Sequence, residues 1–146
     1  MSGLQMTQAE REAFLAEPHI GVIALNEPGR GPLAAPIWYG YEPGSELTVL
    51  IGPQSRKGRL LSEGDRLSLV AQQESLPYRY VSVEGVVASI APSAAEELAA
   101  MAIRYLGEEQ GRAYAAANAG GENVTVAVRI ERWLSIDYGK MQGDTN

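Results

Sequence analysis

The sequence contains no cysteine and a single histidine, His19. The first absence excludes disulfide frameworks, thiolate nucleophiles and cysteine-ligated metals, and it fits a reducing compartment. A lone histidine has no second histidine or cysteine with which to share a metal, so a role in the core or at a strand entry is favoured. A Ser-His-Asp triad would depend on His19, and no G-x-S-x-G motif marks a serine. We therefore expect no metal site and no zinc or serine hydrolase.

Long apolar runs are also missing. No stretch approaches the ~18 residues of a membrane span, and the N-terminal residues lack the pattern of a secretory signal. The net charge of −6 argues against nucleic acid or anionic membrane as the main partner, because both select basic surfaces. We expect a cytoplasmic protein that binds neither nucleic acid nor membrane.

Motifs for nucleotide chemistry are absent as well. The glycines at 29, 31, 120 and 121 lack both G-x-x-x-x-G-K-[ST] and a strand-linked G-x-G-x-x-G, so they are typical of turns. The glutamates form no recognisable paired-carboxylate site. Redox chemistry, if this chain performs any, would require a bound cofactor.

The chain has the size of one domain. Its 146 residues are 45% hydrophobic and 21% charged, which is ordinary for a globular protein. We predict a single cofactor-binding domain over residues 1–140 and a polar C-terminal tail over residues 141–146.

Strand patterns dominate the sequence. Alternation and turn residues predict strands over residues 19–25, 33–41, 46–52, 66–73, 78–90 and 123–130, with a closing segment at 133–138. The turns at 26–32 and 42–45 predict that the first three strands form a meander. Gly85 lies inside the longest strand and indicates a bulge, a device by which a sheet curls toward a barrel. Because most connections are too short for parallel crossovers, we predict a mainly β, α+β fold with an antiparallel sheet.

A few helices should flank this sheet. Thr7 and Glu10 form a capping-box pattern before a short helix that ends ahead of Pro18. Ser93 and Glu96 form a second capping-box pattern, which opens a helix up to Gly107, and residues 108–117 continue as another helix.

One segment carries an unusual charge pattern. Arg56, Lys57 and Arg59 lie in the opening turn of a short predicted helix that follows the strand at 46–52. Cations are unfavourable at this end of a helix, where the macrodipole is already positive, whereas an anion such as phosphate is favoured. Ser55 is a good N-cap for the same turn. A solvated basic turn would explain the pattern equally well.

Aromatic side chains lie near this segment in the sequence. Trp38 and Tyr39 lie on the predicted strand that precedes residues 46–52, and Tyr78, Tyr80 and Trp133 lie on later elements. An aromatic plane beside a phosphate site suits a flavin-like cofactor. The alternative, which composition favours, is that Trp38 and Trp133 belong to the barrel core or to an interface.

Three segments, taken in order and spacing, resemble the pyridoxamine 5′-phosphate oxidase-like split β-barrels, including their flavin- and deazaflavin-dependent oxidoreductase branch. These segments are Ala-Pro-Ile-Trp-Tyr at 35–39, Ser-Arg-Lys-Gly-Arg-Leu-Leu at 55–61 and Tyr-Arg-Tyr-Val-Ser-Val-Glu-Gly at 78–85. Residues 129–140 are similar to the closing strand and tail of the small deazaflavin-type members. The resemblance covers nearly the whole chain.

The resemblance implies a split β-barrel of about six antiparallel strands that forms a homodimer, with a cofactor in the cleft between two barrels. Carried over by position, the cofactor-binding residues would be Ser55, Arg56 and Lys57 at the phosphate, Pro36, Ile37 and Trp38 along the ring or ribityl chain, Leu50 and Ile51 through strand backbone, Arg59 as a further cation, and Gln72 and Trp133 as contacts from a facing strand or the partner subunit.

The implied function is that of a flavin- or deazaflavin-dependent oxidoreductase, which transfers hydride or electrons between bound F420 or FMN and a small organic substrate. The cofactor would carry the bond chemistry, so no catalytic side chain is required, although Tyr39, Tyr80 or Asp137 could assist a proton step. Similarity to the small members slightly favours F420. True pyridoxamine 5′-phosphate oxidases carry an arginine-rich C-terminal segment that this chain lacks, which argues against vitamin B6 oxidation.

Two other functions fit the same fold. One is a non-catalytic module that carries or sequesters haem, a flavin or another planar ligand. The other is a pseudo-enzyme dimer retained as a scaffold.

Overall fold

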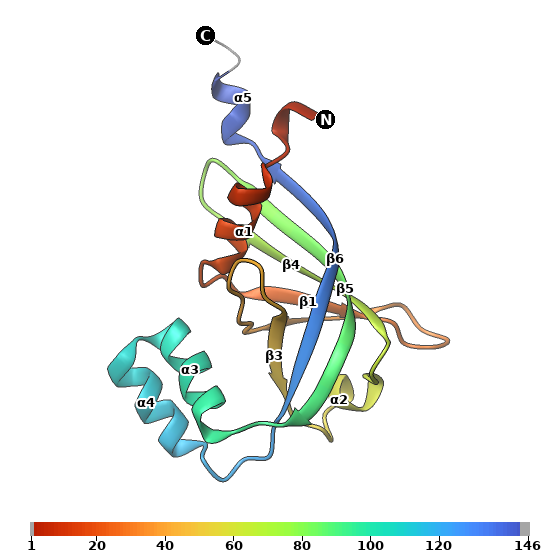
Figure 1. The fold of residues 1–146 in the computed structure, drawn as a ribbon, viewed down its shortest axis with the longest axis vertical. Coiled ribbons are helices and arrows are strands. Elements are labelled where there is room, and N and C mark those ends of the chain that lie inside the picture. The colour runs from red at the N-terminus through yellow and green to blue at the C-terminus, as the bar shows by residue number, and fades with distance from the viewer. Residues whose placement is uncertain (1, 144–146) are drawn as a thin grey trace.

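The computed structural model describes residues 2–143 as a curled six-stranded antiparallel sheet with helices around it (Figure 1). In chain order the elements are η1 (Ser2–Leu4), α1 (Gln8–Ala16), β1 (Gly21–Leu25), β2 (Leu33–Ile37), β3 (Leu47–Ile51), α2 (Arg56–Leu60), β4 (Arg66–Gln73), β5 (Arg79–Pro92), α3 (Ala95–Leu106), α4 (Glu108–Ala117), β6 (Val124–Asp137) and α5 (Gly139–Gly143).

The strand order is β2-β1-β4-β5-β6-β3, and every neighbouring pair is antiparallel. The predicted meander of the first three strands is therefore wrong. The hairpin of β1 and β2 forms as expected, but β3 pairs with β6, in the register Leu47 to Val128. The reason is the curl of the sheet, which carries the chain after β2 to the opposite edge, where the long β6 offers β3 a partner.

The two edge strands meet at one place only. Gly40, three residues after β2, forms an isolated antiparallel bridge with Thr48 of β3. The amide of Gly40 donates to the carbonyl of Thr48 at 2.8 Å, and the amide of Thr48 donates back at 2.9 Å. This bridge nearly closes the sheet into a barrel. The residues of β2 and β3 themselves do not pair with one another, and we call the gap between these two edge strands the split seam.

Gly85 produces the curl in β5, as the sequence predicts. The register of β5 against β6 shifts between Glu84 and Gly85, and again between Val87 and Ser89. A Cβ at Gly85 would lie 2.5 Å from the carbonyl oxygen of Arg129, so only glycine permits this approach of the two strands.

The core lies inside the curl. Residues alternate between buried and less buried along β3, β4 and β5, and side chains such as Val49, Leu69 and Val81 are fully buried. Phe14 and Leu15 of α1 belong to the same cluster, so α1 packs against the barrel. Burial of these apolar side chains is the main stabilising contribution to the fold.

The structure confirms one of the two predicted capping boxes. At α1 the Thr7 hydroxyl accepts from the Glu10 amide, and the Glu10 carboxylate accepts from the Thr7 amide, which confirms the capping box. The predicted second box, of Ser93 and Glu96, does not form. The N-cap is Ala94, which has no side-chain acceptor, so only half of a box is present, in which the Glu97 carboxylate accepts from the Ala94 amide at 2.8 Å, while the Ser93 hydroxyl is hydrogen-bonded to Thr125.

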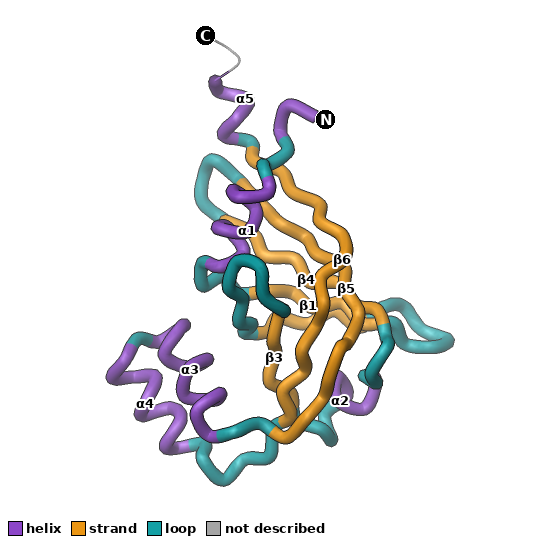
Figure 2. Tube along the Cα trace, viewed as in Figure 1, coloured by secondary structure: helices purple, strands orange, loops and turns teal. Residues whose placement is uncertain are grey.

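Helices α3 and α4 form a hairpin between β5 and β6 that stands beside the barrel, at the lower left of Figures 1 and 2. At the C-terminal end, α5 includes residues 141–143, where a polar tail is predicted, and residues 144–146 lie outside the described part of the chain.

Candidate functional site

Four of the predicted site residues lie at the ends of the two edge strands of the sheet. Pro36 and Ile37 end β2, Leu50 and Ile51 end β3, and the isolated bridge between Gly40 and Thr48 joins the two segments. Pro36 is exposed, whereas the Ile51 side chain is buried in the core. Within residues 2–143, β2 has only β1 as a strand neighbour and β3 has only β6. The facing edges therefore present backbone groups that no strand takes up, which could bind the polar edge of a planar ligand.

Helix α2 follows β3 through a tight turn built on Ser55. The Ser55 hydroxyl donates to the carbonyl of Gly52 at 2.6 Å and accepts from the amide of Gly58 at 3.1 Å, which confirms Ser55 as the N-cap. A Cβ at Gly58 would lie 2.2 Å from the Gly52 oxygen and 2.9 Å from Pro53, so this turn requires glycine. Because its proton is already donated to Gly52, Ser55 shapes the turn, and its predicted phosphate contact stays a prediction.

The three cations of this turn differ in their surroundings. Arg56 forms an ion pair with Glu27 of the β1–β2 turn. Lys57 and Arg59 take part in no ion pair within the part of the chain that the structure describes. The hydrogen bonds from Arg56, supported by the positive charges of Arg56 and Arg30, lower the pKa of Glu27 and keep its carboxyl ionised. Lys57 and Arg59 thus remain free to bind an anion.

Trp38 packs against the helical hairpin. Its ring stacks on Tyr105 of α3 at 5.0 Å between centroids with an angle of 8°, and it lies 5.5 Å from Tyr114 of α4. The Tyr105 hydroxyl donates to the carbonyl of His19 at 2.7 Å and accepts from the amide of Tyr39 at 3.1 Å. One face of Trp38 is therefore occupied by structural packing, as its alternative interpretation predicts, and its predicted ligand contact stays a prediction.

Gln72 and Trp133 lie on other strands. Trp133 of β6 meets Tyr41 edge-on at 6.1 Å, and the guanidinium of Arg11 from α1 lies 4.9 Å from the centre of its ring. Gln72 is exposed on β4, opposite Tyr80 of β5. Their contacts within this chain do not join them to the split seam, so a role at the cofactor would require a partner subunit.

Two of the candidates for proton transfer have structural hydrogen bonds. Tyr39 is fully buried and its hydroxyl donates to the carbonyl of Leu15 at 2.8 Å, and this burial strongly raises its pKa. Asp137 accepts from the amide of Gly139 at 2.8 Å. Tyr80 is half-buried.

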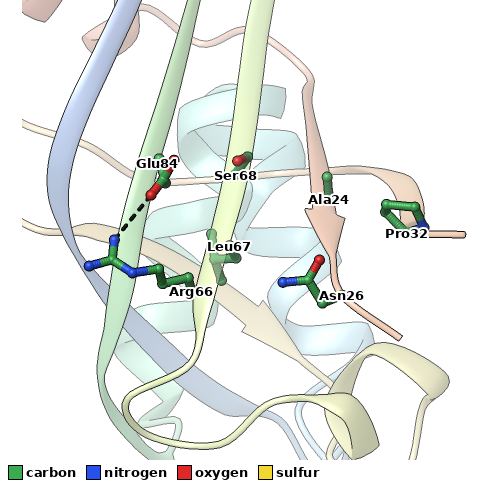
Figure 3. A pocket seen from close by; sticks show the side chains of 7 residues that line it. All are labelled: Ala24, Asn26, Pro32, Arg66, Leu67, Ser68 and Glu84. Carbon is green, nitrogen blue, oxygen red and sulfur yellow. Dashed lines mark hydrogen bonds and ion pairs between the residues drawn. The ribbon is translucent and has the colours of Figure 1, made fainter. Parts of the chain in front are cut away.

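Two cavities lie on different parts of the sheet. One of about 340 Å³ lies between β3 and α3, and its lining includes Thr48, Leu50, Met101 and Arg104. Figure 3 shows another, of about 300 Å³, beside β1, β4 and β5, where Arg66 and Glu84 point toward one another and form an ion pair at 3.0 Å.

Sequence reasoning does not single out three charged residues that the structure places at the basic turn or beside the cavities, Glu27, Arg66 and Arg104. Glu27 and Arg66 occupy positions that look like solvated turn and strand residues. Arg104 follows Met101 at helical spacing, which marks a shared helix face but no ligand.

The described residues contain neither a membrane-spanning helix nor a cluster of metal ligands. No helix there is long and apolar enough to cross a membrane. In the same residues no three histidine, cysteine, aspartate or glutamate side chains gather in a way that could hold a metal ion.

Comparison with known proteins identifies the fold. The crystal structure of a conserved hypothetical protein, Rv2991 from Mycobacterium tuberculosis, matches with a TM-score of 0.76 and 23% identity, covering 97% of this chain and 91% of that one. A protein described as an F420 reductase matches with a TM-score of 0.67 and 21% identity, covering 84% and 94% of the two chains. A FAD and heme binding protein from Mycobacterium smegmatis matches with a TM-score of 0.57 and 21% identity, covering 91% and 71%.

A search of curated proteins gave no significant match. The family model described as pyridoxamine 5′-phosphate oxidase matches residues 7–137, which is nearly the whole chain. The chain therefore belongs to the pyridoxamine 5′-phosphate oxidase family and has its split-barrel fold.

Proposed function

We propose that this protein is a flavin- or deazaflavin-dependent oxidoreductase that holds F420 or FMN along the split seam. The observation that carries the proposal is a pair of cations after β3, Lys57 and Arg59, for which the described part of the chain supplies no ion-pair partner, in a chain of this family. The bound cofactor would supply the hydride or electron transfer, and the protein would supply position, charge and shelter from water.

The residues present fit an anionic group at α2. Lys57 and Arg59 offer two positive charges, and the close turn at Gly58 holds them beside the end of β3. A charge-assisted hydrogen bond to phosphate contributes roughly 1.5–3 kcal/mol, so the two cations can account for much of the anchoring.

The seam suits the ring of such a cofactor. Ile37 is apolar and partly exposed, Ile51 could contribute only its backbone because its side chain is buried, and the free strand edges offer amides and carbonyls to the polar rim of a ring. Pro36 has no amide proton, so this position of β2 can offer only its carbonyl oxygen, which is tolerated because β2 is an edge strand.

A homodimer forms part of the proposal. The outer face of the sheet carries a row of residues aligned across five strands, namely Pro36, Val22, Val70, Ser82 and Leu134. Val22 is 37% exposed and Leu134 is 55% exposed. An aligned apolar row on a sheet face favours burial against a second copy, which would bring Gln72 near a partner's site. A cytoplasmic location is also proposed, from the absence of cysteine.

A carrier of haem or flavin is the second candidate, because a similar structure is described as binding FAD and heme. The only histidine, His19, stacks on Phe14 at 4.2 Å and contacts the Glu17 carboxylate at 3.0 Å. Its ring is thus already engaged, which weakens the case for a histidine-ligated haem.

Titration of the purified protein with FMN and with F420, followed by fluorescence quenching, tests the proposal. We expect micromolar or tighter binding of one of them, and turnover when the reduced cofactor is supplied with an acceptor. Binding without turnover would support the carrier, and failure of both cofactors to bind would refute the oxidoreductase.

A further inference from the structure

Within residues 2–143, Arg56 is the one cation of the basic turn that forms an ion pair. Its Nε lies 3.4 Å from Oε2 of Glu27, and its Nη2 donates to Oε1 of the same carboxylate. Both oxygens therefore occupy one edge of the guanidinium. The Glu27 side chain is only 18% exposed, compared with 48% for Arg56, so Glu27 is the more buried partner of the ion pair.

The occupied edge is one of the two that a guanidinium offers to an anion, the other being the edge formed by Nη1 and Nη2. A guanidinium binds carboxylate or phosphate best through two parallel N–H groups, and Nε with Nη2 forms such a pair. A second anion on the same edge would meet the negative charge of Glu27. Through this edge Arg56 can therefore bind either Glu27 or an incoming phosphate, and a phosphate on the other edge would still find the Arg56 charge partly neutralised by Glu27.

We propose that Glu27 sets the affinity of the anion site by competing, through Arg56, with the anionic group of the ligand. This inference rests on the proposed function. Glu27 is a positioning residue: it keeps Arg56 turned toward the β1–β2 turn until an anion of higher charge, such as a phosphate monoester, displaces it.

The β1–β2 turn has room to release the carboxylate. Glu27 accepts a backbone hydrogen bond from the amide of Arg30 at 3.0 Å, and the next residues, 28–32, include Gly29 with a positive φ of 77°. A cavity of about 230 Å³ lies between this turn and the end of α2, lined in part by Asn26, Pro28 and Leu60. On leaving Arg56 the carboxylate would turn toward this cavity, whose lining also includes Asp65 and Arg66.

The experiment is isothermal titration of FMN and of inorganic phosphate into the wild type, Glu27→Gln, and Glu46→Gln as a matched loss of one exposed negative charge. We expect Glu27→Gln to bind both anions roughly threefold to tenfold more tightly, as the loss of a surface ion pair would allow, and Glu46→Gln to match the wild type. The gain should disappear in the double variant Glu27→Gln/Arg56→Gln, because it acts through Arg56.

Three results would overturn this inference. They are an unchanged or weaker affinity of Glu27→Gln, an equal gain in Glu46→Gln, and a gain that persists without Arg56. A parallel titration of Lys57→Ala separates this inference from the proposed function. If wild type binds FMN and Lys57→Ala weakens that binding while Glu27→Gln changes nothing, only the inference fails. If no variant binds FMN, F420 or phosphate, both fail.

Discussion

The indole of Trp38 and the phenol of Tyr105 stack almost in parallel, 5.0 Å apart, and this pair joins the end of β2 to the helical hairpin of α3 and α4. The same tyrosine is hydrogen-bonded to His19 and Tyr39. A residue expected at the cofactor is therefore also the anchor of a structural element, and its two roles must be measured separately.

Replacing Trp38 should cost stability. Trp38→Ala removes the stack with Tyr105 and the contact with Tyr114, and because Trp38 is half-buried we expect a loss of about 2–3 kcal/mol, below the ~3–5 kcal/mol of a fully buried aromatic. Urea unfolding measures the change, and Trp38→Phe, which keeps a stacking ring, is the control. An unaltered unfolding midpoint in Trp38→Ala would show that the stack does not anchor the hairpin.

The turn at α2 should not accept a side chain at residue 58. Gly58→Ala places a Cβ 2.2 Å from the Gly52 oxygen, so the backbone must shift, at a cost of roughly 1–3 kcal/mol, and the cations move with it. We expect lower melting temperature and weaker FMN or F420 binding. Gly120→Ala, where a Cβ meets nothing within 4 Å, should change neither. Normal binding by Gly58→Ala would separate the turn from the anion site.

Lys57 should contribute directly to binding. Lys57→Ala removes a charge-assisted contact worth roughly 1.5–3 kcal/mol, so cofactor affinity should fall by about one to two decades while the melting temperature stays the same. Arg112→Ala, on the exposed surface of α4, removes the same charge as a control. Equal affinities of Lys57→Ala and wild type would exclude Lys57 from the site.

Acid should weaken the surface ion pairs. Hydrogen bonds from Arg129 and Arg66 lower the pKa of Glu131, so the folded protein holds this proton less tightly than the unfolded chain does. The stabilisation is present above the ordinary glutamate value of 4.5 and is lost as the pH falls through the lowered pKa. The melting temperature should drop less steeply with acid in Glu131→Gln. Parallel pH profiles for the two proteins would show that this carboxylate does not contribute.

Local sequence patterns predict much of this fold, but the partners of its strands depend on distant residues. The bounds of β4 and α4 and the bulge at Gly85 follow from alternation, helix spacing and a single glycine, all of which act within a few residues. The partner of β3 depends on the curl of the whole sheet, and alternation in β3 does not distinguish β2 from β6.

The same limit applies to the site. The basic turn is visible in the sequence because its three cations are adjacent, whereas Glu27 lies 29 residues away from Arg56 and looks like any turn carboxylate. Trp38 fits both a ligand surface and a packing role, and only its neighbours on α3 and α4 reveal the second.

The proposed dimer depends on the outer row of the sheet, so a charge in that row should disrupt it. Leu134 lies opposite Ser82 and is 55% exposed, and Leu134→Glu would have to bury a carboxylate against a second copy, which costs several kcal/mol. We expect the wild type to sediment as a dimer and Leu134→Glu as a monomer, with weaker cofactor binding because each cleft loses its second wall. Leu76→Glu is the matched control, since Leu76 is 76% exposed in the turn between β4 and β5 and lies outside the row. A monomeric wild type that still binds cofactor would place the whole site within one barrel, at the seam between β2 and β3.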